Sequence, residues 1–444
     1  MQGFLNAVNS VVWGLPMLLL FAFTGIRFTI KGRFFQLTGV KKSLKILLKA
    51  FKRNKNSEGI SSFSAFCSVL GACIGTGNIV GIATAVYSGG PGTVFWMIIS
   101  AVFSMMTAYA ENFLGAKYTS TYYFRKSSTG AFSYIENGLN MGGLAKIYGA
   151  LCLCSVFGMG NMTQSNSLCD SIKVTFNVSP IFTALVISLI ALLIINGGIR
   201  RIARFQTILV PVSTIFYFFI SFAVLLKFNQ NIIPVIKLIF TEAFSLKAVT
   251  GFGMYKAMRY GFSRGVFSNE AGLGSSTLLH SQASSSSPEA QGITAMAEVF
   301  IDTVLMCTIT ALVVLVSTDA NASGLYGSEL SSQAYSTIGA VGKFGVGILT
   351  AVFSFMSLTS CSFYGETSFN YLFGEKYIRI YRIIYIIFVF IGGVFSPKLI
   401  WELADICNGL MAIPNLFAIN CLNREVDFPK VKAPTRKDEC FSFL

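Results

Sequence analysis

The sequence predicts an all-α integral membrane protein with about 11 transmembrane helices. Of the 444 residues, 53% are hydrophobic and only 12% are charged, against about 25% charged in an ordinary soluble domain. One spanning helix needs roughly 20 apolar residues, so this composition supplies on the order of 10 to 12 spans. The same numbers exclude a soluble enzyme and a disordered chain. The single His and the lack of C-x-x-C pairs exclude most metal and acid–base catalysis.

Apolar runs give the approximate positions of these spans. The first run covers about 8–26 and has no small-residue cleavage site after it, so we expect an uncleaved first span. The basic, partly amphipathic stretch 27–58 that follows is interpreted as a helix lying on anionic lipid. The remaining runs lie at about 60–87, 93–116, 146–168, 181–196, 205–226, 236–258, 292–316, 344–372, 380–395 and 399–421.

The distribution of Lys and Arg predicts the orientation of the chain. With the N-terminus outside and 11 spans, 28 of the 34 basic residues fall on the inner side. The six outer ones are Lys173, Lys227, Lys237, Lys247, Lys343 and Lys398. This asymmetry follows the positive-inside rule and places the C-terminus in the cytoplasm. It also accounts for the net charge of +15 without a nucleic-acid partner.

Two of the spans contain glycine-rich interruptions. Span 60–87 is interrupted at Gly75-Thr76-Gly77-Asn78, and span 236–258 at Thr250-Gly251-Phe252-Gly253. They are the first members of two five-span sets that run in opposite directions. Interrupted helices at corresponding positions of two inverted halves indicate a transporter binding site.

The physics of such a break supports this interpretation. Unwinding frees backbone N–H and C=O groups in a region where lipid offers no partners. A half-helix that begins near Ile79 has a partly positive N-terminus, which suits a carboxylate. The freed carbonyls of residues 71–74 point the other way and suit a cation. A channel would need a repeated filter motif, and an enzyme would need an activated nucleophile or paired acids; the sequence has neither.

Several motifs give the chain a resemblance to the alanine or glycine:cation symporter family. They occur in the family's order and cover about 60–420. The motifs are Gly75-Thr76-Gly77-Asn78-Ile79-Val80-Gly81, Gly89-Gly90-Pro91-Gly92, Gly158–Asn166, Gly197–Ile202, Arg264–Ser275, Phe300-Ile301-Asp302-Thr303 and Tyr364-Gly365-Glu366.

The resemblance implies a LeuT-type fold with one extra N-terminal helix and a 5+5 inverted repeat. It divides the chain into 1–58 (extra helix and basic loop), 59–226 (spans 2–6), 227–423 (spans 7–11) and a tail, 424–444. It also implies sodium-coupled import of small neutral amino acids, with Na⁺ as the coupling ion and lipid as the surroundings. The protein would then not be an enzyme.

The resemblance further implies two sets of site residues. The substrate carboxylate would meet the unwound segment of span 2, and the rest of the pocket would come from spans 4, 7 and 9. The substrate residues would be Thr76, Gly77, Asn78, Gln164, Gly251, Phe252 and Cys361. Sodium would lie between carbonyls of span 2 and hydroxyls of span 9, from Gly71, Ile74, Ser357, Thr359 and Ser360.

The chain departs from the family in span 9. Met356 stands where the family has a Thr, and Cys361 falls where it has a Trp shortly before Tyr-Gly-Glu. We expect the loss of an indole to open space in the pocket, so that larger neutral amino acids are accepted besides alanine and glycine.

Further polar residues stand in or next to apolar runs. Asp302 lies within a span, where a carboxylate indicates function by default. Proton coupling, cation binding and a structural hydrogen bond are all open, so the alternative is a proton-coupled neutral amino acid carrier of the same fold. Asn161 and Asn166 are expected to be packing polar groups between helices.

Charged residues near the ends of spans give four more expectations. Glu111 and Glu366 are expected near inner ends, paired with Lys or Arg or facing solvent. Glu402 and Asp405 are expected to face an outer vestibule. The stretch Arg264–Ser275 is placed on the inner side, as a gate or a helix cap. His280 precedes a Ser-rich loop and is expected to be solvated.

Overall fold

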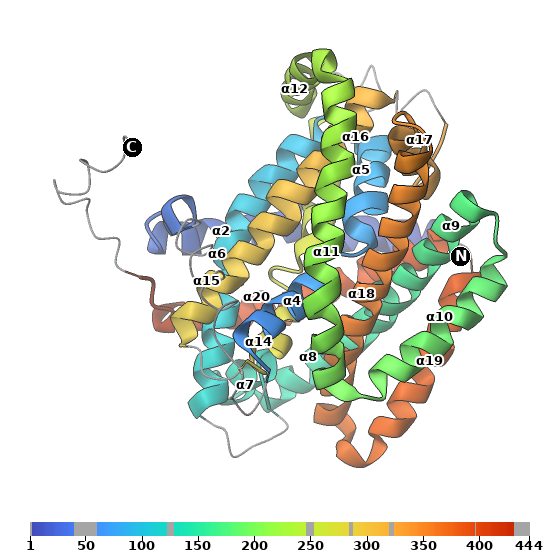
Figure 1. Cartoon of the computed structure of the whole chain (residues 1–444). Coiled ribbons are helices and arrows are strands. Elements are labelled where there is room, and N and C mark those ends of the chain that lie inside the picture. Colours follow the sequence, from blue (N-terminus) through green and yellow to red (C-terminus); the bar gives the residue numbers. More distant parts are fainter. Residues whose placement is uncertain are drawn as a thin grey trace, which may run out of the picture.

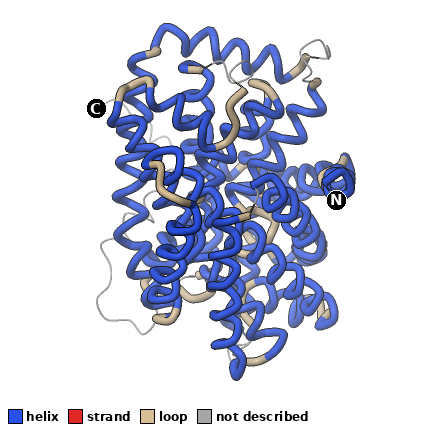
Figure 2. Tube along the Cα trace, turned by 90° about the vertical axis from the view of Figure 1, so that its right-hand side faces the viewer, coloured by secondary structure: helices blue, strands red, loops and turns tan. Residues whose placement is uncertain are grey.

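The protein is a bundle of helices in the part of the chain that the computed structural model describes, residues 2–39, 60–121, 128–245, 253–283, 287–318, 324–395 and 397–429 (Figures 1 and 2). One isolated bridge, Ile60 to Ala283, is the only β-type pairing in these ranges. The helices are α1 (Gln2–Val12), α2 (Leu15–Lys31), α4 (Ser62–Cys73), η1 (Gly77–Gly81), α5 (Ile82–Gly89), α6 (Thr93–Thr121), α7 (Ala131–Ser133), η2 (Tyr134–Gly138), α8 (Gly142–Ser155), η3 (Val156–Thr163), α9 (Gln164–Phe176), α10 (Pro180–Ile195), α11 (Gly198–Lys227), α12 (Asn229–Ala243), α13 (Met254–Asn269), α14 (Ser276–His280), α15 (Pro288–Val299), η5 (Phe300–Cys307), α16 (Thr308–Ser317), α17 (Ser328–Ser336), α18 (Ala340–Phe373), η6 (Glu375–Tyr377), α19 (Ile378–Val394), α20 (Pro397–Cys421) and η7 (Leu422–Glu425). The amphipathic helix expected within 27–58 lies mostly outside the described residues.

Many of these helices are long and apolar enough to cross a bilayer. Among the described residues, eight continuous helical segments meet that requirement, and the bent pair Ser62–Cys73 and Gly77–Gly89 makes a ninth. The expected count of eleven is reached only if the shorter α10 and the pair α13 and α14 also cross. The chain is therefore a multi-pass membrane protein.

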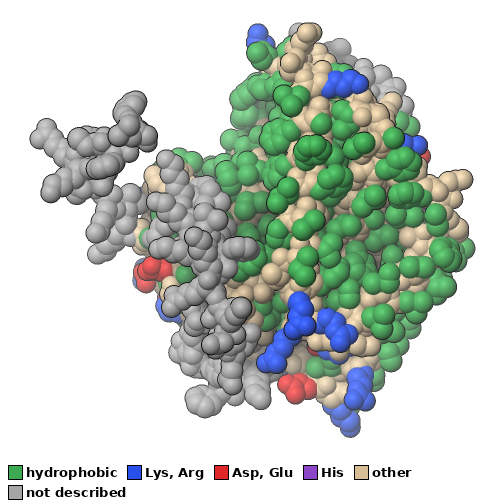
Figure 3. Space-filling view, in the orientation of Figure 1, with side chains coloured by type: hydrophobic (Ala, Val, Ile, Leu, Met, Phe, Trp, Pro, Cys, Tyr) green, Lys and Arg blue, Asp and Glu red, His purple; other side chains and the backbone are tan. Residues whose placement is uncertain are grey.

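The surface of the bundle has the polarity of a protein that contacts lipid. Large apolar side chains are exposed along α10, α11 and α19, for example Leu189, Ile208 and Ile383. On the face seen in Figure 3, apolar side chains cover the middle, and the Lys and Arg side chains lie toward the two ends. A soluble protein rarely exposes so large an apolar patch, whereas lipid tails are the natural partner of this one.

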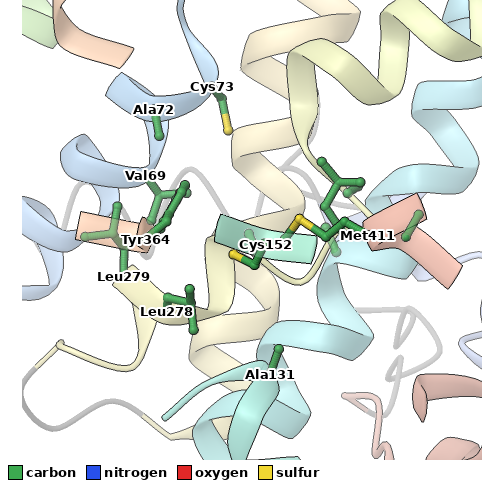
Figure 4. Close-up of a cluster of buried hydrophobic side chains, with 14 of the residues drawn as sticks. Val69, Ala72, Cys73, Ala131, Cys152, Leu278, Leu279, Tyr364 and Met411 are labelled. Carbon is green, nitrogen blue, oxygen red and sulfur yellow. The ribbon is translucent and has the colours of Figure 1, made fainter. Parts of the chain in front are cut away.

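The interior is built from helices that are apolar on most of their surface. Helix α6 packs against α13 and α15, and α18 packs against α4, α9 and α11. Figure 4 shows part of one apolar cluster, in which Val69 of α4 and Tyr364 of α18 lie side by side and Met411 of α20 lies beyond Cys152. The interrupted helices thus lie inside the bundle, away from lipid.

The first interruption lies where the sequence predicts it. Helix α4 ends at Cys73 and η1 begins at Gly77, and the two halves of the span are bent by 44°. A Cβ atom at Gly75 would lie 2.8 Å from Gln164 Oε1 and 2.9 Å from Ser357 Cβ. Only glycine therefore lets α9 and α18 approach the break so closely.

The predicted second interruption, Thr250–Gly253, lies outside the described residues except for Gly253, and another interruption is found further along the chain. Residues 229–243 form α12, which covers one end of the bundle (Figure 1), and a new helix, α13, begins at Met254. The chain leaves the helical conformation later, between α13 and α14. Glu270, Gly272 and Gly274 there have φ values of 55°, 88° and 76°. The two glycines adopt this left-handed backbone without strain, which explains a break at this place.

We expect Gly292→Ala to destabilise the protein. A Cβ atom at Gly292 on α15 would lie 2.9 Å from both the ring and the backbone oxygen of Tyr109 on α6. Overpacking of this kind costs about 1–3 kcal/mol, so the midpoint of thermal unfolding in detergent should fall. Gly142→Ala is the matched control, because nothing lies within 4 Å of its Cβ position. An equal midpoint for the two variants would contradict close packing of α15 on α6.

Candidate substrate and cation sites

The two interruptions lie side by side in the middle of the bundle. Cys73 Sγ, at the end of α4, is 3.8 Å from the backbone oxygen of Asn269 at the end of α13. A Cβ atom at Gly77 would lie 3.3 Å from Phe267 Cδ1 and 3.5 Å from Ser268 Cα. The N-terminus of η1 and the C-terminus of α13 therefore face the same region, where helix dipoles place opposite partial charges.

Backbone N–H groups at the first break are held by side-chain oxygens. The N–H of Thr76 donates to Gln164 Oε1 (2.9 Å), and the N–H of Gly75 donates to Asn78 Oδ1 (3.1 Å). Gln164 Nε2 donates to Met159 O (3.1 Å), which fixes the orientation of the amide. The buried hydroxyl of Thr76 has no partner among the described residues. These oxygens occupy the positions that the oxygens of a bound anion would take.

The structure thus brings Thr76, Asn78 and Gln164 together, and Cys361 lies next to this group, with its Sγ 3.8 Å from the Oγ of Ser357. Cys361 packs against Gly160, where an added Cβ atom would overlap the cysteine. The space expected from the missing indole is therefore filled by the close approach of η3 to α18. A cavity of about 10 Å³ is left beside Cys361, room for about one water. The predicted site residues Gly251 and Phe252 lie outside the described residues.

Asp302 connects both interrupted helices. Its carboxylate accepts hydrogen bonds from Asn78 Nδ2 (2.7 Å), Ser268 Oγ (2.7 Å) and the neighbouring Thr303 Oγ1 (2.8 Å). Asn269 Nδ2 donates in turn to Thr303 Oγ1 (3.1 Å). All of these donors are neutral, so hydrogen bonds alone stabilise the buried acid in this arrangement.

The predicted cation residues of α18 divide into two groups. Thr359 Oγ1 and Ser360 Oγ both accept hydrogen bonds from Gln206 Nε2, at 3.1 and 2.9 Å. Ser357 instead faces the break, since its Oγ would lie 3.0 Å from a Cβ atom at Gly75. On the other side of Gln206 lies α4, whose last carbonyls, including that of Gly71, have no helical partners because the helix ends.

Gln206 is a residue that the sequence reasoning missed. It lies near the start of α11 and is fully buried between α4 and α18. Its signal was a lone amide inside the apolar run 205–226. That signal is weak, because a single polar residue in a span is often a packing contact.

A compact lid covers the site on the side that carries α17. The rings of Phe267 and Trp401 stack with centroids 5.0 Å apart, and the Arg264 guanidinium lies 5.3 and 5.1 Å from these rings. Arg264 also forms an ion pair with Asp405, and the two side chains are 8% and 6% exposed. We call these four residues the lid. It excludes water from the region of the two breaks.

Beyond the lid lies a vestibule of about 610 Å³, lined among others by Thr84, Tyr87, Arg259 and Glu402. The expectation that Glu402 and Asp405 face a vestibule is confirmed. The stretch Arg264–Ser275, expected on the opposite side of the membrane from these two acids, does not lie wholly opposite to them. Its first residue, Arg264, lines this vestibule together with the two acids, because α13 runs from here down to the second break.

Two other expectations for charged residues were wrong. His280 is 2% exposed, with Nδ1 2.6 Å from Gln291 Oε1 and Nε2 2.9 Å from Glu298 Oε2, because α14 packs it against α15. Glu111 is buried and accepts from the Gly272 N–H (3.2 Å) and from an amide of α20. It therefore stabilises the second break and has no cationic partner in the described contacts.

Three expectations for polar residues are confirmed. Glu366 pairs with Arg382 through two contacts of 2.8 Å. Asn161 Nδ2 donates to Tyr385 O (2.8 Å), and Asn166 Nδ2 donates to Gly392 O (3.0 Å), so both join η3 and α9 to α19.

Broken helices that meet inside a multi-pass bundle, beneath a closed lid, define a membrane transporter. A sequence profile described as the sodium:alanine symporter family matches residues 1–432, and the chain belongs to this family. It is a family of transporters, not of enzymes, and it supports amino acid symport. The identification from sequence motifs is thereby confirmed.

Relatives and solved structures agree with this assignment. The sodium/alanine symporter AgcS of Methanococcus maripaludis is 37% identical, with 94% of each chain covered. The probable sodium/glutamine symporter GlnT of Bacillus subtilis is 33% identical, with 98% of this chain and 91% of GlnT covered. A mutant of the Eremococcus coleocola manganese transporter shares the fold, with a TM-score of 0.51, 14% identity, and 82% and 78% of the two chains covered.

We expect Asp405→Asn to lower both stability and uptake. The variant leaves the buried Arg264 charge without its counter-ion, which costs about 3–5 kcal/mol when a buried pair is broken. Glu366→Gln is the control, because its pair with Arg382 is partly exposed, at 18% and 19%, and water can replace the lost contact. Thermal unfolding and uptake into proteoliposomes measure the two effects. Equal losses in the two variants would contradict a special role for the lid.

Proposed function

We propose that the protein is a sodium-coupled symporter that imports small neutral amino acids. The observation that carries this proposal is the pair of N–H groups at Gly75 and Thr76, held by amide oxygens of Asn78 and Gln164. A substrate carboxylate can take the place of the Gln164 oxygen. The names of the relatives, which mention sodium, alanine and glutamine, support the same substrate class.

The opposed helix ends favour a zwitterion over a simple anion. The N-terminus of η1 carries a partial positive charge and the C-terminus of α13 a partial negative charge. They meet near Gly77 and Ser268. An α-amino acid matches both, with its carboxylate on the first break and its ammonium on the carbonyls at the end of α13. A neutral side chain is favoured because the two charges of the lid, Arg264 and Asp405, are already paired with each other.

The size of the substrate depends on how far the walls separate. The cavity of about 10 Å³ beside Cys361 is smaller than any amino acid. Binding therefore requires Gln164 to leave the Thr76 N–H and α18 to move away from Gly160. Alanine needs the smallest movement, and larger neutral amino acids such as glutamine need a larger one.

The proposed sodium site lies between α4 and α18. The oxygens are the carbonyls of Gly71 and Ile74, the carbonyl of Met356, and the hydroxyls of Thr359 and Ser360. Oxygen ligands suit a hard cation, and the free carbonyl end of α4 adds a partial negative charge. Ser357, which faces Gly75, belongs to the substrate side in this arrangement.

The proposed topology follows the basic residues. The N-terminus and the vestibule would face the outside of a bacterial-type inner membrane, and the C-terminus the cytoplasm. The two inverted halves would be 59–226 and 227–423, with α4–η1 and α13–α14 as their corresponding broken helices.

Coupling then follows from where the two ligands bind. Sodium binds α4 to α18, while the substrate binds η1 to α13. Because both ligands use the same interrupted span, each favours the conformation in which its own contacts are complete. Each can shift the equilibrium only by its difference in affinity between the two states.

We expect an inward sodium gradient to drive uptake of radiolabelled alanine into proteoliposomes, with competition by unlabelled glycine. In Thr359→Val the half-saturating sodium concentration should rise about tenfold or more, since metal sites lose 10–100-fold when a supporting group is removed. Thr367→Val is the control, because its hydroxyl only bonds the Phe363 carbonyl within the same helix. Uptake that ignores sodium but follows a pH gradient would favour the proton-coupled alternative.

Asp302→Asn separates a structural role from a proton relay. The amide can accept from Asn78 and donate to the hydroxyls of Ser268 and Thr303, so the contacts between the broken helices are retained. We expect uptake to stay sodium-dependent with an unchanged pH profile. A flattened pH profile, measured from pH 5.5 to 8.5, would instead identify Asp302 as a proton carrier.

A further inference from the structure

The side-chain amide of Gln206 lies at the centre of the proposed cation site. Its Nε2 donates to Met356 O (2.8 Å), Thr359 Oγ1 (3.1 Å) and Ser360 Oγ (2.9 Å). These are the three α18 oxygens that the proposed function assigns to sodium. An amide nitrogen has only two hydrogens, so three acceptors at these distances mean that the oxygens converge on one point.

The remaining atoms of this amide fill the gap toward α4. Gln206 Oε1 is buried and has no partner among the described residues. A Cβ atom at Gly71 would overlap this oxygen. The side chain of Gln206 therefore extends from α11 across the space between the last turn of α4 and the hydroxyls of α18.

Converging oxygens need a positive group between them. Their partial negative charges repel one another in a low-dielectric interior unless a cation or a hydrogen-bond donor separates them. The NH₂ group of Gln206 is such a donor. A cation bound by the same three oxygens would occupy the same point, so the two cannot be present together.

We propose that Gln206 is a tethered substitute for the coupling cation. In the ion-free protein its amide keeps the α18 oxygens together, and an entering sodium ion displaces it. The concentration of sodium needed for binding is therefore set by competition with this side chain. The proposal rests on the sodium site described above and adds a residue from a third helix, α11, to it.

The decisive variant is Gln206→Met, which has similar volume but neither donor nor acceptor. Sodium binding is measured on purified protein as the rise in thermal unfolding midpoint with NaCl, with choline chloride added to keep ionic strength constant. The half-saturating sodium concentration should fall about fivefold or more, because one net hydrogen bond corresponds to roughly that factor. The same fall should appear in the sodium dependence of alanine uptake.

Two further variants make the result specific. Ser213→Ala is the control on α11: its hydroxyl contacts Met356 Sδ (3.8 Å) and not the ligand oxygens, so sodium binding should not change. Gly71→Ala keeps the glutamine but places a methyl group against its Oε1. Because this methyl group disfavours the position of the amide, the half-saturating sodium concentration should also fall in this variant. This variant tests the proposal if Gln206→Met does not fold.

The outcomes distinguish this proposal from the proposed function. Weaker or unchanged sodium binding in Gln206→Met would overturn the proposal that the Gln206 amide stands in for the cation. Sodium-driven uptake by the native chain would then still support the symporter. If Gln206→Met binds sodium and the native protein does not, the proposed role of Gln206 is supported and sodium coupling in the native chain is overturned. If neither protein binds sodium, both the role of Gln206 and sodium coupling are overturned.

Discussion

The architecture depends on one constraint: a backbone polar group inside a membrane protein must find its partner within the protein. The chain interrupts two helices where lipid supplies no hydrogen bonds, so side chains from other helices have to supply them. Gln164 does so at the first break, and Glu111 with Asn415 at the second. These contacts require tight packing, which accounts for the glycines at 75, 272 and 274.

The same constraint explains why one region can serve both stability and transport. A side-chain oxygen that holds a backbone N–H can be replaced by an oxygen of a ligand at little cost, because one hydrogen bond is exchanged for another. Gln164 at the first break and Gln206 beside α18 are both amides on flexible side chains. Both lie where the proposed ligands bind, so the protein is stable without the ligands and can still admit them.

The sequence predicted much of the fold and part of the site. Apolar runs located most spans, and the first break followed from four residues that are consecutive in the chain. The break at Gly272 and Gly274 was not predicted, because local composition does not distinguish these glycines from other glycine pairs in the sequence. Long-range contacts stabilise this break: Glu111 on α6 and Asn415 on α20 both bond to Gly272. For the same reason Gln206 was missed and His280 was wrongly expected to be solvated, since their partners come from other segments.

The lid has a consequence for a protein that works at changing salt concentrations. Exposed ion pairs weaken as ionic strength rises, because dissolved ions screen them. The pair of Arg264 and Asp405 lines the vestibule, but its side chains are only 8% and 6% exposed and the guanidinium lies against the rings of Phe267 and Trp401, so screening weakens this pair less than an exposed one. In the proposed function, sodium binds as a ligand at one site, and as a dissolved electrolyte it weakens the Arg264–Asp405 contact only a little. The strength of closure therefore depends only weakly on the salinity of the medium that the vestibule faces.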